Sequence, residues 1–359
     1  MGGGTTAPAG VAAAEEEGVA KAVTTATPHA DIPNIMSSLP TGPGFPPYQL
    51  SYYGGFWLSG LFLKGIAASH ARFKPRPTDV LLTSFPKSGT TWLKALAFSA
   101  LNRAAHPPSS AGHHPLYRSS PHDLVSFLEV SPELIATDYA GEDELYGELP
   151  SPRLLASHLP YSLLPNGIKI VYVCRDPKDT LVSLWHFHEK TTAVLLGVPG
   201  VAGASPPTMP TFEEAFELFC EGRCISGPHW RHALEFWEAS RRRPDQVLFL
   251  RYEDMLLDPA GNLRTLAAFM GCPFSPEEEA AGVVHHVVEL CSLAKLKGLE
   301  VNRSGSTLLG LKNEVFFRKG TVGDWSSCMT PAMAARLDGV VKEALKGSTL
   351  TFGPAPVIN

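Results

Sequence analysis

Residues 79–92 read Asp-Val-Leu-Leu-Thr-Ser-Phe-Pro-Lys-Ser-Gly-Thr-Thr-Trp, an apolar run followed by a short polar loop. The run over 79–85 predicts a buried strand, because it is short, apolar and ended by turn residues. Residues 90–104 predict a helix, since their apolar side chains recur at helical spacing. The loop between them, 86–89, therefore joins a strand to a helix start. N–H groups without helix partners and the helix dipole attract an anion at such a place.

The polar residues of this loop strengthen that prediction. Lys87 adds a full positive charge, and Gly89 lets the backbone approach a ligand closely. Ser88, Thr90 and Thr91 add hydroxyl donors. An ordinary capped glycine turn would need fewer donors, so the loop predicts a phosphate or sulfate ligand.

Apolar patterns further along the chain extend the alternation of strand and helix. Runs at 154–157, 168–174 and 247–252 predict more buried strands, and 176–189 predict another helix. Alternating strands and helices are typical of βαβ units and a parallel sheet. The sequence thus predicts an α/β fold, a single domain with a central parallel β-sheet flanked by helices, over residues 45–355.

Three segments fall outside this pattern. Residues 1–35 are rich in Gly, Ala and Thr and have almost no large apolar side chains, so we expect a disordered N-terminal tail. The segments 105–120 and 197–210 have the composition of flexible loops. Long loops in a compact domain often cover a site, and either segment is a candidate for that role.

Charge and composition narrow the range of partners. The 359-residue chain carries a net charge of −5, which argues against nucleic acid or an anionic membrane as a partner. The most apolar stretch, 56–71, contains Lys64 and is too short to span a membrane. Glu15, Glu16 and Glu17 oppose a transit peptide, and no basic-then-apolar leader precedes them. Six cysteines without a C-x-x-C pair fit reduced thiols, so we expect a cytoplasmic protein.

The Walker A loop of nucleotide kinases uses the same strand, loop and helix, but its residue order differs. Its pattern G-x-x-x-x-G-K-[ST] fails, because Lys87 precedes Gly89 instead of following it. Asp176 and Glu253 are better explained as helix-start or surface groups than as Mg²⁺ ligands. A nucleotide kinase, which would need Mg²⁺, is therefore a second interpretation.

The loop at 86–92 resembles the 5′-phosphosulfate loop of the cytosolic sulfotransferases, and two further motifs of that family follow in order. Residues 168–183 resemble its 3′-phosphate region, in which a strand delivers an arginine and the next helix a serine. Residues 316–325 resemble its glycine-containing motif that closes over the nucleotide. Residues 301–303, Val-Asn-Arg, look like the plant branch. The resemblance covers roughly residues 48–330 and implies the P-loop nucleotide-kinase-like sulfotransferase fold.

This resemblance implies a specific reaction. The sulfuryl group of 3′-phosphoadenylyl sulfate (PAPS) passes to a hydroxyl of a small-molecule acceptor, and 3′,5′-adenosine bisphosphate (PAP) is released, without a metal. His158 matches the family's base, and an ordinary histidine pKa of ~6.5 suits proton removal. Lys87 would stabilise charge on the leaving oxygen in an in-line displacement. The implied co-substrate-binding residues are Lys87, Ser88, Gly89, Thr90, Thr91, Trp92, Arg175, Ser183, Arg318, Lys319 and Gly320.

Several positions depart from the family pattern. Ser226 stands at the place of an adenine-contacting tyrosine, and Leu293 at the place of a phenylalanine beside the adenine, so contacts to the base are open. Ala156 replaces a lysine of the animal members, and we assign it no role. The dimerisation motif of animal relatives would begin at Ser326 and keeps only Thr330, so we expect a monomer.

Turnover and the acceptor stay open at this point. A third interpretation is a binding protein that keeps the nucleotide pocket without catalysis. Flavonols, brassinosteroids, hydroxylated jasmonates, salicylate-like phenols and desulfoglucosinolates all fit the resemblance as acceptors. We expect their pocket to be formed by residues 48–57, the region around His186 and the 197–210 loop. The other twelve of the 13 histidines are interpreted as structural or surface groups.

Overall fold

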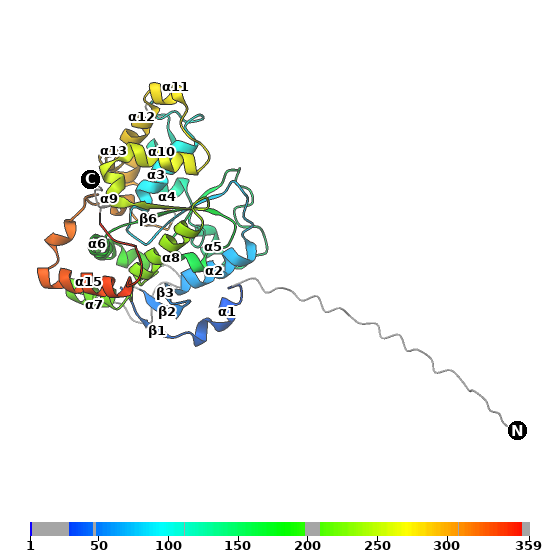
Figure 1. Cartoon of the computed structure of the whole chain (residues 1–359), viewed down its shortest axis with the longest axis vertical. Helices are drawn as coiled ribbons and strands as arrows, with labels where there is room; N and C mark the ends of the chain where they lie inside the picture. The colour runs from blue at the N-terminus through cyan, green and yellow to red at the C-terminus, as the bar shows by residue number, and fades with distance from the viewer. Residues whose placement is uncertain (2–28, 46–47, 111, 198–208, 308, 354–359) are drawn as a thin grey trace.

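The computed structural model describes residues 1, 29–45, 48–110, 112–197, 209–307 and 309–353. A central parallel sheet lies between layers of helices (Figure 1). Its strands follow the order β5 (Leu154–Ser157), β4 (Val80–Ser84), β6 (Lys169–Cys174) and β7 (Val247–Arg251). Each neighbouring pair is parallel. The predicted α/β fold is confirmed, and each of these strands lies within its predicted run.

A small antiparallel sheet precedes the central one, with strands β1 (Thr41–Pro43), β2 (Gln49–Tyr53) and β3 (Phe56–Ser59). The α-helices are α1 (Ile32–Ile35), α2 (Gly60–Arg72), α3 (Thr90–Leu101), α4 (Pro121–Leu124), α5 (Pro132–Ala136), α6 (Pro177–Leu195), α7 (Phe212–Cys220), α8 (His229–Arg242), α9 (Tyr252–Leu257), α10 (Pro259–Phe269), α11 (Pro276–Ala280), α12 (Val283–Leu290), α13 (Leu293–Gly298), α14 (Glu300–Ser304) and α15 (Pro331–Ala344). Short 3₁₀ turns are η1 (Met36–Ser38), η2 (Pro115–Tyr117), η3 (Tyr161–Leu163), η4 (Asn313–Phe316) and η5 (Asp324–Ser327).

Strand β6 is buried on both of its faces. Ile170 and Tyr172 belong to a core cluster that also contains side chains of α2, α6 and α8. Val171 and Val173 point the other way, into a second cluster with side chains of α3, α10 and α12. Successive strand residues alternate between faces, so a strand covered on both sides must be apolar throughout. The unbroken apolar run in the sequence has this physical cause.

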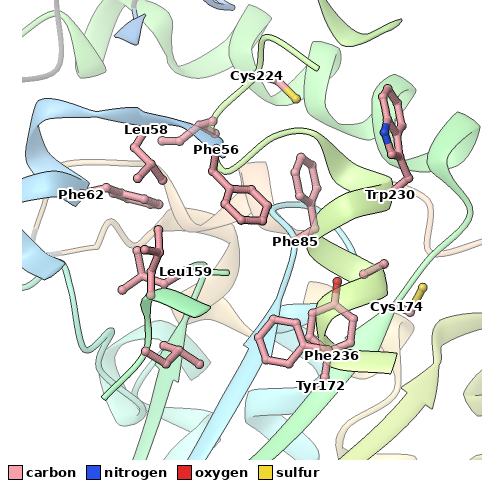
Figure 2. Close-up of a cluster of buried hydrophobic side chains, with 14 of the residues drawn as sticks. Phe56, Leu58, Phe62, Phe85, Leu159, Tyr172, Cys174, Cys224, Trp230 and Phe236 are labelled. Atoms are coloured by element: carbon pink, nitrogen blue, oxygen red, sulfur yellow. The ribbon is translucent and has the colours of Figure 1, made fainter. Parts of the chain in front are cut away.

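Aromatic side chains support the end of β4. Figure 2 shows Phe85, the residue after this strand, among Phe56, Tyr172 and Phe236. The rings of Tyr172 and Phe236 are stacked with their centres 4.1 Å apart. Burial of large rings contributes strongly to a core. Because Phe85 is fully buried, this packing also anchors the loop that follows it, residues 86–89.

A buried ion pair joins the beginnings of β4 and β5. Arg153 donates from Nη2 to Asp79 at 2.6 Å and from Nε to the same carboxylate at 3.0 Å. Nη2 also donates to the carbonyl of Lys74 at 2.6 Å. A guanidinium can be buried only with such partners, and the two-point contact fixes its orientation. The pair aligns the two strands, so their carboxyl ends, at Ser84 and Ser157, reach the same edge of the sheet.

The small sheet was not predicted, although the sequence carries a signal for it. Gly54 and Gly55 connect β2 to β3, with φ of +60° and +90°. Two central residues with positive φ form the hairpin turn that matches strand twist, and glycine adopts that conformation most readily. A Gly-Gly pair between aromatic runs therefore indicates a hairpin.

The folded part begins before the predicted boundary of the tail at residue 35. Ile32 in α1 is completely buried, so residues 29–35 pack onto the domain. The rest of the predicted tail, 2–28, lies outside the described residues, as do 198–208 of the predicted loop at 197–210. The 105–120 segment consists of turns and η2 where it is described. In the parts of the chain described, no helix has the length and apolar character to cross a membrane.

Candidate active site

The carboxyl ends of β4, β5 and β6 meet beside a cavity of about 480 Å³. Ligands of open parallel sheets bind outside this edge. Eleven of the twelve predicted site residues line the cavity, namely Lys87, Gly89, Thr90, Thr91, Trp92, His158, Arg175, Ser183, Arg318, Lys319 and Gly320. The exception is Ser88, whose side chain is fully buried. The tertiary structure thus brings four separated segments of the chain to one site.

The loop between β4 and α3 has the geometry of an anion cradle. Gly89 precedes the first turn of α3 with a φ of +110°, which favours glycine. A Cβ on this residue would lie 2.8 Å from the ring of Tyr252. Ser84 and Thr90 share a hydrogen bond between their hydroxyls. The buried Oγ of Ser88 has no hydrogen-bond partner within the described residues. Such a group costs free energy, and an anion bound at the loop would fit it.

The ammonium of Lys87 lies among aromatic rings. Its Nζ is 4.2 Å from the ring centre of Phe187 and 5.6 Å from that of Phe316. Burial, with the nearby charges of Arg175 and Arg318, lowers the pKa of Lys87 to about 7. Within the described residues Lys87 forms no ion pair with a carboxylate. A buried ammonium beside two guanidinium groups and without a carboxylate partner of its own is unfavourable, so this arrangement favours a bound polyanion.

Arg175 connects the loop to the C-terminal motif. Its Nη1 donates to the carbonyl of Lys87 at 3.2 Å, and its Nη2 donates to the carbonyl of Thr321 at 3.1 Å. The guanidinium also lies over the ring of Tyr252, 4.7 Å from its centre. Its Nε is buried without a partner in the described part of the chain. Arg175 therefore keeps a donor for a ligand while holding two segments together.

The C-terminal motif is held against α6 by one carboxylate. Asp179, in the first turn of α6, accepts hydrogen bonds from the backbone N–H groups of Gly323 at 2.8 Å and Trp325 at 2.9 Å. Asp324 in turn pairs with both Arg318 and Lys319. These contacts place two cations at the cavity wall.

Gly320 lets this motif approach helix α13. Its φ is +66°, and a Cβ added to it would lie 2.4 Å from a methyl group of Leu293. Leu293 lines the cavity, so the departure from the family pattern at this position faces the site. Ser226 is buried and is not part of the cavity wall. Of the two departures, Leu293 is the one that can contact a ligand.

The hydrogen bond of His158 defines its proton arrangement. Nδ1 lies 2.9 Å from the carbonyl oxygen of Ser84. A carbonyl only accepts, so Nδ1 carries the proton and Nε2 keeps its lone pair. Burial is the main cause that lowers the pKa of His158 to about 3, and the charges of Lys94 and Lys87 lower it further. The expectation of an ordinary histidine pKa is therefore wrong for the ligand-free protein, in which His158 is neutral at physiological pH.

Two buried side chains hold the backbone of His158. Its N–H donates to Glu129 Oε1 at 2.7 Å. Its carbonyl accepts from His232 Nε2 at 3.2 Å, and the other ring nitrogen of His232 accepts from the hydroxyl of Tyr172 at 3.0 Å. With the bond to Ser84, three contacts hold this residue, and Nε2 is the ring nitrogen that keeps its lone pair.

Asp176 and Glu253, the two carboxylates considered as Mg²⁺ ligands, both accept hydrogen bonds from the backbone. Asp176 caps α6, because its carboxylate accepts from the N–H of Lys178 at 2.8 Å. Glu253 accepts from the N–H of Asp176 at 2.8 Å. The helix-start interpretation of Asp176 is confirmed. Glu253 is not a surface group, since only 3% of its side chain is exposed.

The sequence interpretation missed several polar residues at the cavity. His122, Glu129 and His188 line it, although the two histidines were interpreted as structural or surface groups. Lys94 is completely buried behind it on α3. The signal for Lys94 was a charged residue on the apolar face of a predicted helix. Nothing comparable marks His122, whose place depends on how α4 packs against α3.

Residues 77–349 match the family model of the sulfotransferase domain. The chain belongs to the sulfotransferase family. Cytosolic sulfotransferase 15 of Arabidopsis thaliana is 41% identical over 326 residues, which cover 89% of this chain and 86% of that protein. Cytosolic sulfotransferase 12 of the same plant is 40% identical over 323 residues, with coverages of 89% and 93%.

Solved structures agree with this assignment. A putative steroid sulphotransferase of Arabidopsis thaliana is 35% identical, with a TM-score of 0.66, and the match covers 89% of this sulfotransferase and 94% of that chain. A mouse sulfotransferase complexed with PAP is 26% identical, with a TM-score of 0.61 and coverages of 84% and 96%. The predicted family and fold are confirmed. The chain is a PAPS-dependent enzyme that transfers a sulfuryl group to a small-molecule hydroxyl, which decides against the nucleotide kinase.

Proposed function

We propose that this sulfotransferase uses His158 as the general base in a direct in-line displacement at sulfur. The observation that supports it is the Nδ1 hydrogen bond to Ser84, which leaves a basic Nε2 on a residue lining the same cavity as Lys87. The acceptor hydroxyl gives its proton to Nε2 as its oxygen bonds to sulfur. The bond from sulfur to the phosphate oxygen breaks, and PAP leaves with the added charge.

The predicted co-substrate residues divide the remaining work. Lys87, with the amides and hydroxyls of the 86–92 loop, holds the phosphosulfate and stabilises the leaving oxygen. Arg175 and Ser183 hold the 3′-phosphate, where a guanidinium gives a two-point contact. The segment 318–320 closes over the nucleotide. Unpartnered donors at Ser88 Oγ, Arg175 Nε and Arg318 Nε fit a ligand with two anionic groups. The mouse relative with PAP bound supports the same assignment.

The acceptor proposed here is an apolar hydroxylated molecule of steroid or phenol type. Beyond Lys87 and His158 the cavity wall is mostly apolar and aromatic, with Phe62, Phe127, Phe187, Leu195, Leu311 and Phe316 among its residues. Such walls bind flat or polycyclic apolar molecules, and the few polar groups then orient the reacting hydroxyl. The likeness to a putative steroid sulphotransferase supports this size and polarity.

The test is transfer of labelled sulfate from PAPS to a panel of hydroxylated steroids and phenols. The His158→Ala variant should lose at least about 100-fold in kcat on the best acceptor, as expected for removal of a general base. The Lys87→Ala variant should lose about 100-fold or more. The control is His285→Ala, because His285 is exposed on α12, away from the cavity.

Calorimetry with PAP separates the possible failures. Full activity in the His158→Ala variant would refute the base assignment. Tight binding of PAP without transfer to any acceptor would favour the binding protein that lacks turnover. Absence of PAP binding in the wild-type protein would overturn the proposed site. Chelator should leave transfer unchanged, since no step in this mechanism uses a metal.

We further propose a cytoplasmic monomer. The relatives are named cytosolic sulfotransferases, and the chain keeps only Thr330 of the animal dimerisation motif. Sedimentation of the full chain at micromolar concentration should give one species of about 38.6 kDa. A species of twice that mass would contradict the monomer.

A further inference from the structure

A buried lysine lies directly behind the phosphosulfate loop. Lys94 follows Thr91 by three residues on α3, so the two side chains share one face of the helix. None of the Lys94 side chain is exposed. Its ammonium donates to the carbonyl of Val125 at 2.8 Å and lies 3.5 Å from the ring centre of Phe127. A buried ammonium is costly, and packing alone would be served as well by an apolar side chain.

The third contact of this ammonium, with His122, determines the direction of the hydrogen bonds between Lys94 and Thr91. Nζ of Lys94 lies 3.3 Å from Nδ1 of His122, and Nε2 of the same ring lies 2.9 Å from the hydroxyl oxygen of Thr91. An ammonium has only donors, so Nδ1 accepts and the proton of the neutral imidazole is on Nε2. Nε2 then donates to Thr91 Oγ1. The hydroxyl of Thr91 is left to donate its own proton elsewhere, and Thr91 lines the cavity.

Burial and charge keep the ring neutral, as this arrangement requires. Burial lowers the pKa of His122 well below its usual value, and the charges of Lys94 and Lys87 act in the same direction. Aromatic contacts fix the ring plane, since its centre lies 4.0 Å from that of Phe316. Phe316 is the first residue of the C-terminal motif, residues 316–325. The histidine is therefore held between the loop and that motif.

We propose that Lys94 is a positioning residue that acts through His122 to make Thr91 an obligate hydrogen-bond donor toward the phosphosulfate. This proposal rests on the proposed function, because the acceptor of the Thr91 proton is the leaving group of that reaction. A hydroxyl that already points at the leaving oxygen needs no reorientation as charge gathers there, so it lowers the barrier. The same contact in the ground state is weaker, so the effect falls on kcat more than on the KM for PAPS.

The experiment tests this relay, Lys94–His122–Thr91, with one substitution of Lys94 and a matched pair of substitutions of His122. Lys94→Met keeps an apolar stem of similar length but removes the donor. His122→Phe removes both ring nitrogens, whereas His122→Gln can still accept from Lys94 and donate to Thr91. We expect Lys94→Met and His122→Phe to lower kcat by about 10- to 100-fold, with the PAPS KM and PAP affinity changed by less than about threefold. His122→Gln should retain most of the wild-type kcat.

Nitrogen-15 NMR of labelled histidine, with PAP bound, gives a readout that simple packing would not move. The His122 signals, assigned by their absence in His122→Gln, should show the proton on Nε2 in the wild-type protein and a mixture of tautomers in Lys94→Met. A proton on Nδ1 in the wild type, or an unchanged kcat in folded Lys94→Met, would overturn the relay. Equal losses of kcat in His122→Gln and His122→Phe would also overturn the relay. If Lys94→Met fails to fold, the comparison of these two His122 variants is the deciding test. If wild-type protein does not bind PAP, the failure belongs to the proposed function instead.

Discussion

His158 and Lys87 show how burial prepares single residues for an anionic co-substrate. Burial and two nearby ammonium groups lower the pKa of His158 to about 3 in the ligand-free protein. A bound polyanion would offset those ammonium charges, so the pKa of His158 should rise toward its ordinary range when PAPS is present. Burial, the main cause, stays in the complex, so the change in this pKa is limited to the part that the two ammonium charges cause. A bound anion also stabilises the charged form of Lys87, so the pKa of Lys87 should rise in the complex too.

The lowered pKa of Lys87 predicts the pH dependence of PAPS capture. In the ligand-free protein the Lys87 ammonium is charged below about pH 7 and loses its proton above that pH. Since kcat/KM reports the free enzyme, kcat/KM for PAPS should fall above pH 7, by up to about tenfold per pH unit. The value of kcat should stay level to higher pH, because the bound anion keeps both Lys87 and Lys94 charged. Steady-state kinetics between pH 6 and 9 measure both.

Two variants test whether Lys87 causes the fall of kcat/KM for PAPS above pH 7. The guanidinium of Lys87→Arg stays protonated throughout this range, so the decline should disappear even if activity is lower. Lys94→Met removes the other lysine whose pKa burial lowers to about 7, and it should keep the decline. A Lys87→Arg profile that falls like the wild type would exclude Lys87 as its source.

At the scale of elements, α6 is what connects the 3′-phosphate region to the C-terminal motif. Replacement of Asp179 by alanine removes the acceptor for two backbone N–H groups, those of Gly323 and Trp325. The 318–327 segment should then exchange its amide hydrogens faster. Because the cations of this segment leave their place, the KM for PAPS should rise by about tenfold or more, an effect of one or two hydrogen bonds. The acceptor KM should change little.

The control for this variant is Asp338→Ala. Asp338 also contacts α6, through a 2.5 Å ion pair with Lys178, but it is more than half exposed. Exposed ion pairs contribute little, so PAPS binding should be unchanged. Hydrogen exchange followed by mass spectrometry compares the two variants. Unaltered exchange of the 318–327 segment in Asp179→Ala would show that other contacts hold it.

The whole molecule responds to acid through its buried histidines. Burial lowers the pKa of His158, His229 and His232 to about 3. Each is neutral when folded but takes up a proton when unfolded below about pH 6.5. Stability is therefore fully present above pH 6.5 and is lost as the pH falls toward 3, by about 1.4 kcal/mol per group and pH unit. Carboxyl groups with a raised pKa, such as Glu129, oppose this in part.

A single histidine variant isolates this contribution. His229 packs among Phe85, Phe219 and Phe352, so phenylalanine fits its surroundings. In urea unfolding, the stability of His229→Phe should fall by about 1 kcal/mol less than that of the wild type between pH 6.5 and 5.5. The exposed control His285→Gln should behave like the wild type. An equal acid sensitivity in His229→Phe and the wild type would contradict a neutral buried His229.

The local sequence was enough to predict the central sheet, the anion loop and eleven of the residues that line the cavity. Short apolar runs predict strands buried on both faces, and a polar loop between strand and helix predicts an anion site wherever the sheet is placed. Both are local patterns. His158 and Arg175 were predicted from the resemblance to the sulfotransferase motifs. Each follows the end of a strand, and parallel strands end at one edge.

The tertiary structure alone decided how those residues behave. Lys94, His122 and Glu129 come from separate elements, and no local pattern places them together. The proton arrangement of His158 depends on the carbonyl of Ser84, 74 residues away. The pKa values of Lys87 and His158 depend on burial and on nearby charges. Both effects add up contributions from all the groups packed around the side chain. Such sums exist only in the folded protein, because in the extended chain each group is surrounded by water.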